Sequence, residues 1–125
     1  MIADFQCTVL DCSDAAELAR FYGAVLGGEV NKPDRRWLLS DGWATLHTGS
    51  GLILAFQRVA DYRPPQWPDP ARPQQSHLDL AVSDLDEAEA QVRGLGATLL
   101  DAGDGQRSWR VYADPAGHPF CLVRH

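Results

Sequence analysis

Histidine, cysteine and aspartate side chains stand where they could bind a metal ion or move a proton. His77 and Asp79 are two residues apart in a segment that favours an extended strand, so both would lie on one face, with the carboxylate placed to orient the imidazole. Cys7 and Cys121 could supply thiolate ligands for zinc, although no Cys-x-x-Cys spacing is present. The plainer alternatives are a histidine satisfied by a backbone carbonyl and cysteines buried as small hydrophobes.

An internal repeat places Cys7 and His77 at equivalent positions. Sliding the chain by 70 positions places Cys7 over His77. The same shift aligns one set of four residues with another: Leu10, Ser13, Asp14 and Glu17 with Leu80, Ser83, Asp84 and Glu87. We expect two copies of one supersecondary unit to pack together, because neither could close a core alone, and a ligand to bind in the seam.

The first copy, at about residues 4–59, is predicted to be a βαβββ unit. Phe5 to Cys12 has the composition of a strand, and Asp14 with Glu17 forms a capping box that starts a helix over about 14–26. Gly27 and Gly28 end this helix. Turn-forming residues then separate three short strands, near 29–31, near 37–39 or on to 47, and at 52–58.

The second copy, at about residues 76–125, repeats this order after a linker. Residues 60–75 hold five prolines, which deny the segment both helix and central strand. Beyond them we predict a strand, a helix and three further strands, at 77–82, 84–95, 97–100, 109–113 and 120–124. The whole chain, residues 1–125, is expected to form a single domain.

Composition and charge narrow the classes of partner. The 125 residues are 45% hydrophobic, enough for a sizeable core. A net charge of −6 disfavours nucleic acid and anionic membranes as partners. No basic region followed by an apolar run opens the sequence and no stretch is long enough to span a membrane, so we expect a cytoplasmic protein. Three cysteines, an odd number, indicate reduced thiols.

Several motifs together resemble the glyoxalase, bleomycin-resistance and extradiol dioxygenase superfamily, which has the vicinal oxygen chelate fold. They cover nearly the whole chain in the family's order: Arg20-Phe21-Tyr22, Val25-Leu26-Gly27, Leu95-Gly96-Ala97, and Asp114-Pro115-Ala116-Gly117-His118-Pro119-Phe120. The resemblance implies an α+β fold in which two tandem βαβββ units form curled mixed sheets, each a half barrel. It also implies a homodimer.

The resemblance further implies where a metal would bind. Many enzymes of the family hold a divalent metal through His and Glu on four strands, and those positions fall here on Cys7, Ala55, His77 and Cys121. Only His77 keeps the usual ligand type, and Ala55 has no lone pair to donate. We therefore expect no obligatory cofactor. The alternative is zinc or another divalent metal on Cys7, His77 and Cys121.

Aromatic residues are candidates for the wall of a cavity. Four tryptophans exceed what so small a core requires, so we select Trp37, Phe56 and Trp109 as cavity residues. Ordinary core packing or a dimer interface is the alternative. Gln57 is added as a polar candidate, on the interpretation that a β-bulge must turn it toward the cavity. No chemistry is assigned to the remaining histidines, His47, His118 and His125.

The prediction from sequence is a small-molecule-binding protein. The ligand would be an organic molecule, held in the barrel cavity without an obligatory metal, as in drug-binding or bleomycin-resistance-like proteins, and the acidic balance suits a cation. The alternatives are a lyase or isomerase using zinc or metal-free acid–base chemistry at His77, and a domain that binds another protein. The candidate ligand-binding residues are Cys7, Trp37, Phe56, Gln57, His77, Asp79, Trp109 and Cys121, with His77 the catalytic candidate.

Overall fold

The structure divides the chain into two compact units. It is a computed structural model that describes residues 1–124; His125 lies outside the described residues. Unit 1 is Met1–Tyr62 and unit 2 begins at Arg63. Each has the order βαβββ, so the predicted α+β class and the duplicated plan are confirmed. The organisation as one domain stays a prediction.

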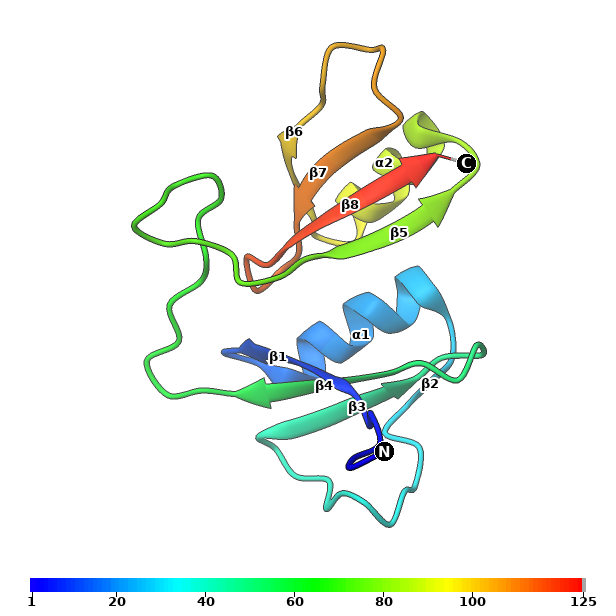
Figure 1. The fold of residues 1–125 in the computed structure, drawn as a ribbon, viewed down its shortest axis with the longest axis vertical. Coiled ribbons are helices and arrows are strands. Elements are labelled where there is room, and N and C mark those ends of the chain that lie inside the picture. Colours follow the sequence, from blue (N-terminus) through cyan, green and yellow to red (C-terminus); the bar gives the residue numbers. More distant parts are fainter. Residues whose placement is uncertain (125) are drawn as a thin grey trace. The chain divides into compact units, whose positions relative to one another are not determined.

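Unit 1 is a four-stranded mixed sheet with one helix. Its elements are β1 (Thr8–Cys12), α1 (Ala15–Leu26), β2 (Glu29–Val30), β3 (Trp43–His47) and β4 (Ile53–Arg58). The strand order is β1-β4-β3-β2, with β1 parallel to β4 and the other pairs antiparallel. Figure 1 shows α1 lying along one face of this sheet.

The helix α1 forms where its capping residues and its apolar stripe predict. The Asp14 side chain accepts the backbone N–H of Glu17 at 3.0 Å, and Gly27, at φ 71°, ends the helix. Tyr22 is fully buried and stacks on Phe56 of β4, with 5.8 Å between ring centroids. Apolar burial therefore joins α1 to its sheet.

Unit 2 repeats this plan with its own sheet and helix. Its elements are β5 (Leu78–Val82), α2 (Leu85–Gly94), β6 (Thr98–Asp101), β7 (Trp109–Ala113) and β8 (Pro119–Arg124). The order β5-β8-β7-β6 matches that of unit 1, again with the first pair parallel. Neither described helix has the length and apolar content needed to cross a membrane.

A polar cluster joins α2 to its sheet. The Tyr112 hydroxyl donates to Glu89 at 2.9 Å, and Arg110 donates to Glu89 and to Asp86, each at 2.8 Å. Burial and the carboxylate of Glu89 raise the pKa of Tyr112 to about 12. The pKa of Glu89 is lowered: its burial acts in the opposite direction, but the hydrogen bonds from Tyr112 and Arg110 outweigh it.

Two predicted strands start three or more residues later than expected. The first begins at Thr8 rather than Phe5, and the strand predicted near 37–39 or on to 47 begins only at Trp43. Asn31, at φ 55°, ends β2 while still exchanging hydrogen bonds with Thr45. Asp34 then accepts the backbone N–H of Arg36 in a turn, and regular pairing resumes only at Trp43. The chain between β2 and β3 is therefore an irregular segment, residues 31–42.

Each sheet has a helix-covered face and a helix-free face. In unit 1 the stacking of Phe56 on Tyr22 assigns Phe56 and its neighbours in register, Leu10 and Ala44, to the covered face. Alternation then places Ala55 and Thr45 on the helix-free face. In unit 2 the helix-free face carries Asp79, Trp109, Val111 and Cys121, because Tyr112 and Phe120 point to α2.

Candidate functional site

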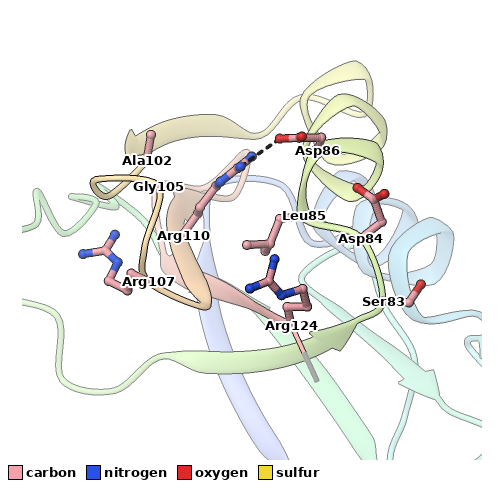
Figure 2. A pocket seen from close by; sticks show the side chains of 9 residues that line it. All are labelled: Ser83, Asp84, Leu85, Asp86, Ala102, Gly105, Arg107, Arg110 and Arg124. Atoms are coloured by element: carbon pink, nitrogen blue, oxygen red, sulfur yellow. Dashed lines mark hydrogen bonds and ion pairs between the residues drawn. The ribbon is translucent and has the colours of Figure 1, made fainter.

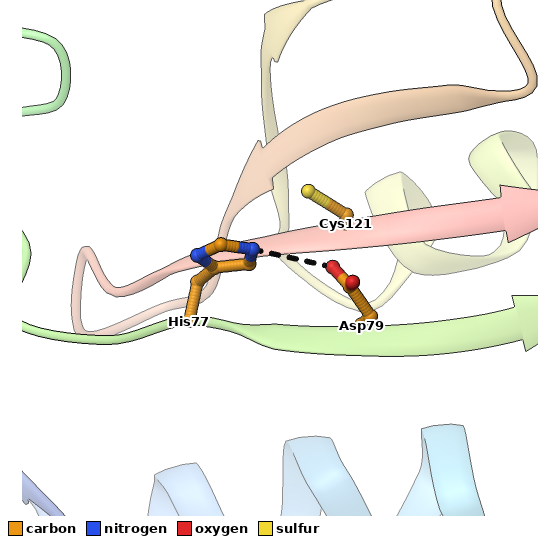
Figure 3. Close-up of side chains that lie close together, drawn as sticks. All are labelled: His77, Asp79 and Cys121. Carbon is orange, nitrogen blue, oxygen red and sulfur yellow. Dashed lines mark ion pairs between the residues drawn. The ribbon is translucent and has the colours of Figure 1, made fainter.

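Three side chains that could bind a metal ion or transfer a proton meet on the helix-free face of unit 2 (Figure 3). Asp79 of β5 and Cys121 of β8 are paired in register in the parallel ladder, and His77 lies just before β5. The Nε2 atom of His77 is 3.3 Å from Oδ1 of Asp79. One nitrogen, one oxygen and one sulfur atom, one from each residue, all lie within 4.8 Å of one another. The structure thus brings together three of the predicted site residues.

The three members differ in exposure and therefore in reactivity. Cys121 is buried, and this burial, with the Asp79 carboxylate beside it, raises the pKa of the thiol to about 11. The thiol is consequently protonated at neutral pH. The side chains of His77 and Asp79 are 42% and 63% exposed, so an incoming molecule can reach the imidazole and the carboxylate.

The donor set of this cluster fits a divalent metal. Imidazole nitrogen, carboxylate oxygen and cysteine sulfur are all zinc ligands, and three protein ligands leave a position for water or substrate. This set contains Asp79, which the sequence analysis proposed as a residue that contacts the organic ligand but not as a metal ligand. Cys7 lies in unit 1, where its thiol pKa is raised by burial, so the set of Cys7, His77 and Cys121 stays a prediction.

The corresponding corner of unit 1 lacks this chemistry. Val9 pairs with Ala55 in the register that joins Asp79 to Cys121 in unit 2. Neither Val9 nor Ala55 has a donor atom in its side chain, which leaves Cys7 alone. The duplicated halves therefore have diverged at this position, and the cluster belongs to unit 2.

The aromatic candidates lie in three different environments. Trp109 is on the helix-free face of unit 2, 43% exposed, with the Arg107 guanidinium 4.6 Å from its ring centroid. Trp37 is in segment 31–42, with its ring edge-on to His47 at 6.3 Å. Phe56 is fully buried against Tyr22 on the helix-covered face, which makes it a core residue of unit 1.

Gln57 is on the same face as Ala55 without any bulge. The register of β4 with both neighbouring strands is regular from Leu54 to Gln57. Residues two apart in a regular strand point to the same side, so the premise that a bulge must turn Gln57 toward that face is wrong. The side chain of Gln57 is exposed.

His47 forms a histidine–carboxylate pair that sequence reasoning missed. Its Nε2 atom is 3.1 Å from Oδ2 of Asp34, and the two side chains are only 15% and 16% exposed. Hydrogen bonds from the side chain and the backbone of Arg36 hold the pKa of Asp34 well below its ordinary value. Asp34 carries only a turn signal in the sequence, in Lys32-Pro33-Asp34, and no periodicity relates it to His47.

A separate cavity of about 200 Å³ lies at the N-terminal end of α2 (Figure 2). Charges of both signs line it, and the Arg110–Asp86 ion pair spans one side. None of the predicted site residues is among its lining residues, which are Ser83, Asp84, Leu85, Asp86, Ala102, Gly105, Arg107, Arg110 and Arg124.

Solved structures with the same fold cover almost the whole chain. A glyoxalase/bleomycin resistance protein/dioxygenase family enzyme from Burkholderia phytofirmans is similar with a TM-score of 0.70 and 19% identity, covering 98% of both chains. The fosfomycin resistance protein FosX from Mesorhizobium loti is similar with a TM-score of 0.68 and 15% identity, covering 98% of this chain and 92% of that one. FosX from Listeria monocytogenes has a TM-score of 0.67 and 14% identity, covering 100% and 95%.

The sequence comparisons agree with this fold. No curated protein matches the chain in sequence. The sequence model of the glyoxalase-like domain matches residues 7–123, a range that contains every element of both units up to Val123. The expected resemblance is confirmed, and the chain belongs to the glyoxalase-like domain family.

Proposed function

We propose that this protein binds a small organic molecule on the helix-free face of unit 2, without an obligatory metal. The observation that carries the proposal is the cluster of His77, Asp79 and Cys121, in which two reachable polar groups stand beside a buried thiol. His77 and Asp79 would hold a polar group of the ligand, and Trp109 on the same face would pack against a flat part of it.

The exposed carboxylate of Asp79 on this face favours a ligand with a basic nitrogen. The Asp79 carboxylate is exposed and can pair with a cation, and the mean charge of the protein is negative. Two of the structural neighbours are named for fosfomycin resistance, which supports a small drug-like molecule as a class. The homodimer and the cytoplasmic location stay predictions.

A thermal-shift screen of the tag-free protein tests the proposal. Fosfomycin, bleomycin and a set of basic aromatic amines are the probes, because a ligand that binds only the folded state raises its stability. H77Q and D79N should each reduce the affinity of a selected probe at least fivefold, which corresponds to the loss of about one hydrogen bond. H118Q, a histidine of the same unit in the turn before β8, is the matched control. Affinity unchanged in both H77Q and D79N would contradict the proposal.

A second candidate function is a metal-dependent lyase or isomerase. The specific observation is that His77, Asp79 and Cys121 supply one nitrogen, one oxygen and one sulfur donor in a cluster open to solvent. A divalent ion bound there would polarise a substrate oxygen, while the chain's own contribution is to hold the three donors together on paired strands. Stoichiometric zinc that is lost in both C121S and D79N favours this function. Zinc lost in C121S but kept in D79N would point to the set that contains Cys7 instead.

A further inference from the structure

Three polar side chains in a row on unit 1 have a buried polar atom without a hydrogen-bond partner. Trp43, Thr45 and His47 alternate along β3, so all three lie on the helix-free face. The atoms are Nε1 of Trp43, Oγ1 of Thr45 and Nδ1 of His47, each almost fully shielded from solvent and unpaired within residues 1–124. One further atom of the described chain, in Gln74, has this property. The unpaired groups are therefore concentrated on one strand face.

Such a concentration calls for a partner molecule. Buried polar groups in native proteins are nearly always hydrogen-bonded, and leaving one unpaired sacrifices the hydration that it had in the unfolded chain. Thr45 is fully buried, so bulk solvent cannot form a hydrogen bond with its hydroxyl. Three unpaired groups at consecutive positions of one face form a surface that a hydrogen-bonding ligand could satisfy.

The neighbours of His47 define what this surface can bind. Asp34 is held ionised by Arg36, whose Nε donates to it at 2.9 Å, so the carboxylate accepts the Nε2–H of the imidazole. In the neutral imidazole, Nδ1 is then left with its lone pair and acts as an acceptor. Trp43 offers a donor, and Thr45 offers both a donor and an acceptor. The row therefore offers a donor at Trp43, an acceptor at Nδ1 of the neutral His47, and both at Thr45 between them.

Segment 31–42 contacts both ends of the row. Asp34 and Trp37 both contact the His47 side chain, and Ser40 forms an isolated bridge with Trp43. The ends of the segment are anchored by Asn31, bonded to Thr45, and by Gly42, whose carbonyl accepts the N–H of Arg58. In Figure 1 the segment lies on the side of the sheet away from α1. Between these two ends the segment has no strand pairing beyond that bridge.

We propose that Trp43, Thr45 and His47 form a second ligand site, for a neutral planar molecule that carries an amide group, and that segment 31–42 opens to admit it. An amide supplies both an acceptor and a donor, and neighbouring side chains on one strand face are about 7 Å apart, so its two polar atoms can pair with Thr45 and one neighbour in the row while the ring of the ligand lies beside the other neighbour. The rings of Trp37 and Trp43 suit a flat ligand. The row itself contains no carboxylate or ammonium group, which disfavours a charged ligand. The site goes beyond the proposed function, because it lies entirely in unit 1.

Benzamide is the probe, with acetophenone and benzoate as matched controls. Acetophenone keeps the ring and the carbonyl but has no N–H, and benzoate replaces the amide by a charge. Titration of ¹⁵N-labelled protein with benzamide should move the Nδ1 resonance of His47 and the indole N–H resonance of Trp43, and acetophenone and benzoate should bind at least fivefold more weakly. T45V should weaken benzamide at least fivefold, and H77Q in unit 2 should leave it unchanged.

The same titration can overturn the proposal. If saturating benzamide moves neither resonance, or if acetophenone binds as well as benzamide, the row is no amide site. If binding survives in T45V but is lost in H77Q, the ligand belongs to unit 2, and the two proposals are thereby distinguished. The wild-type resonances give an answer even if T45V does not fold.

Discussion

Replacing Thr45 by valine should stabilise the protein. Thr45 is fully buried, and its hydroxyl has no hydrogen-bond partner among the residues described. Valine keeps the β-branched shape and the strand preference while it removes the hydroxyl. Since an unpaired buried polar group costs about 1–3 kcal/mol, T45V should raise the free energy of unfolding by that amount. For 125 residues this corresponds to a rise in Tm of about 4 °C per kcal/mol.

The control for this substitution is a threonine that does have a partner. The Thr48 hydroxyl donates to the carbonyl of Leu52 at 2.9 Å, so T48V removes a hydrogen bond and should cost about 0.5–1.5 kcal/mol. Urea unfolding followed by tryptophan fluorescence and by circular dichroism measures both variants against wild type. If T45V loses stability as T48V does, the Thr45 hydroxyl is paired, for example with a buried water, and the reasoning fails.

This measurement also bears on the ligand site of unit 1. If the unpaired Thr45 hydroxyl destabilises the ligand-free protein but strengthens ligand binding, the protein gives up stability for function at this position. T45V should therefore combine a higher Tm with weaker benzamide binding. A variant that gained stability without losing affinity would separate the two effects and contradict the site.

Four more predictions concern other parts of the fold. Y112F should lower the free energy of unfolding by about 1.5–3 kcal/mol in urea titrations, because the hydroxyl bonds to a charged group, Glu89; an unchanged midpoint would refute this. The lowered pKa of Glu89 stabilises the fold above its unfolded pKa, so this contribution should fade as pH falls through the folded pKa, and E89Q should flatten the acid limb of a stability–pH curve. Cys121, with a pKa of about 11, should resist iodoacetamide at pH 8 and be alkylated faster as pH rises toward 11, as peptide mass spectrometry would show; rapid alkylation at pH 7 would be the contrary result. G28A should cost about 1–3 kcal/mol from its φ of 96° alone, and more because the new Cβ would lie 2.3 Å from the His47 carbonyl oxygen; a normal Tm would contradict this.

Local patterns in the sequence predict the elements of this fold well. The helix starts at Asp14 and Asp84 follow from side chains that cap within three residues, a relation that short-range chemistry dictates. The pairing of Asp79 with Cys121 was not predicted, because the repeat shows which residues are equivalent in the two units but not which strands pair within one sheet. Of the strand predicted near 37–39 or on to 47, only 43–47 forms, since Asn31 redirects the chain through a positive φ that composition does not reveal.

The pair of Asp34 and His47 lay beyond sequence reasoning for a different physical reason. It depends on how an irregular segment folds back over a strand, which no periodicity encodes. The role of Phe56 was also beyond what the sequence alone could decide. An aromatic residue suits both a cavity wall and a core, and only its stacking on Tyr22 decides between them.

The two halves of the duplicated chain attach their helices by opposite means, and solvent will act on them differently. The helix α1 buries five residues, including Leu18, Phe21 and Tyr22, whereas α2 buries only Leu85 and Val92 and depends on Arg110. Sulfate salts strengthen apolar burial while they screen ion pairs, so they should tighten the first attachment and loosen the second. One polypeptide would thus combine a half whose helix attachment tolerates salt with a half whose helix attachment responds to it.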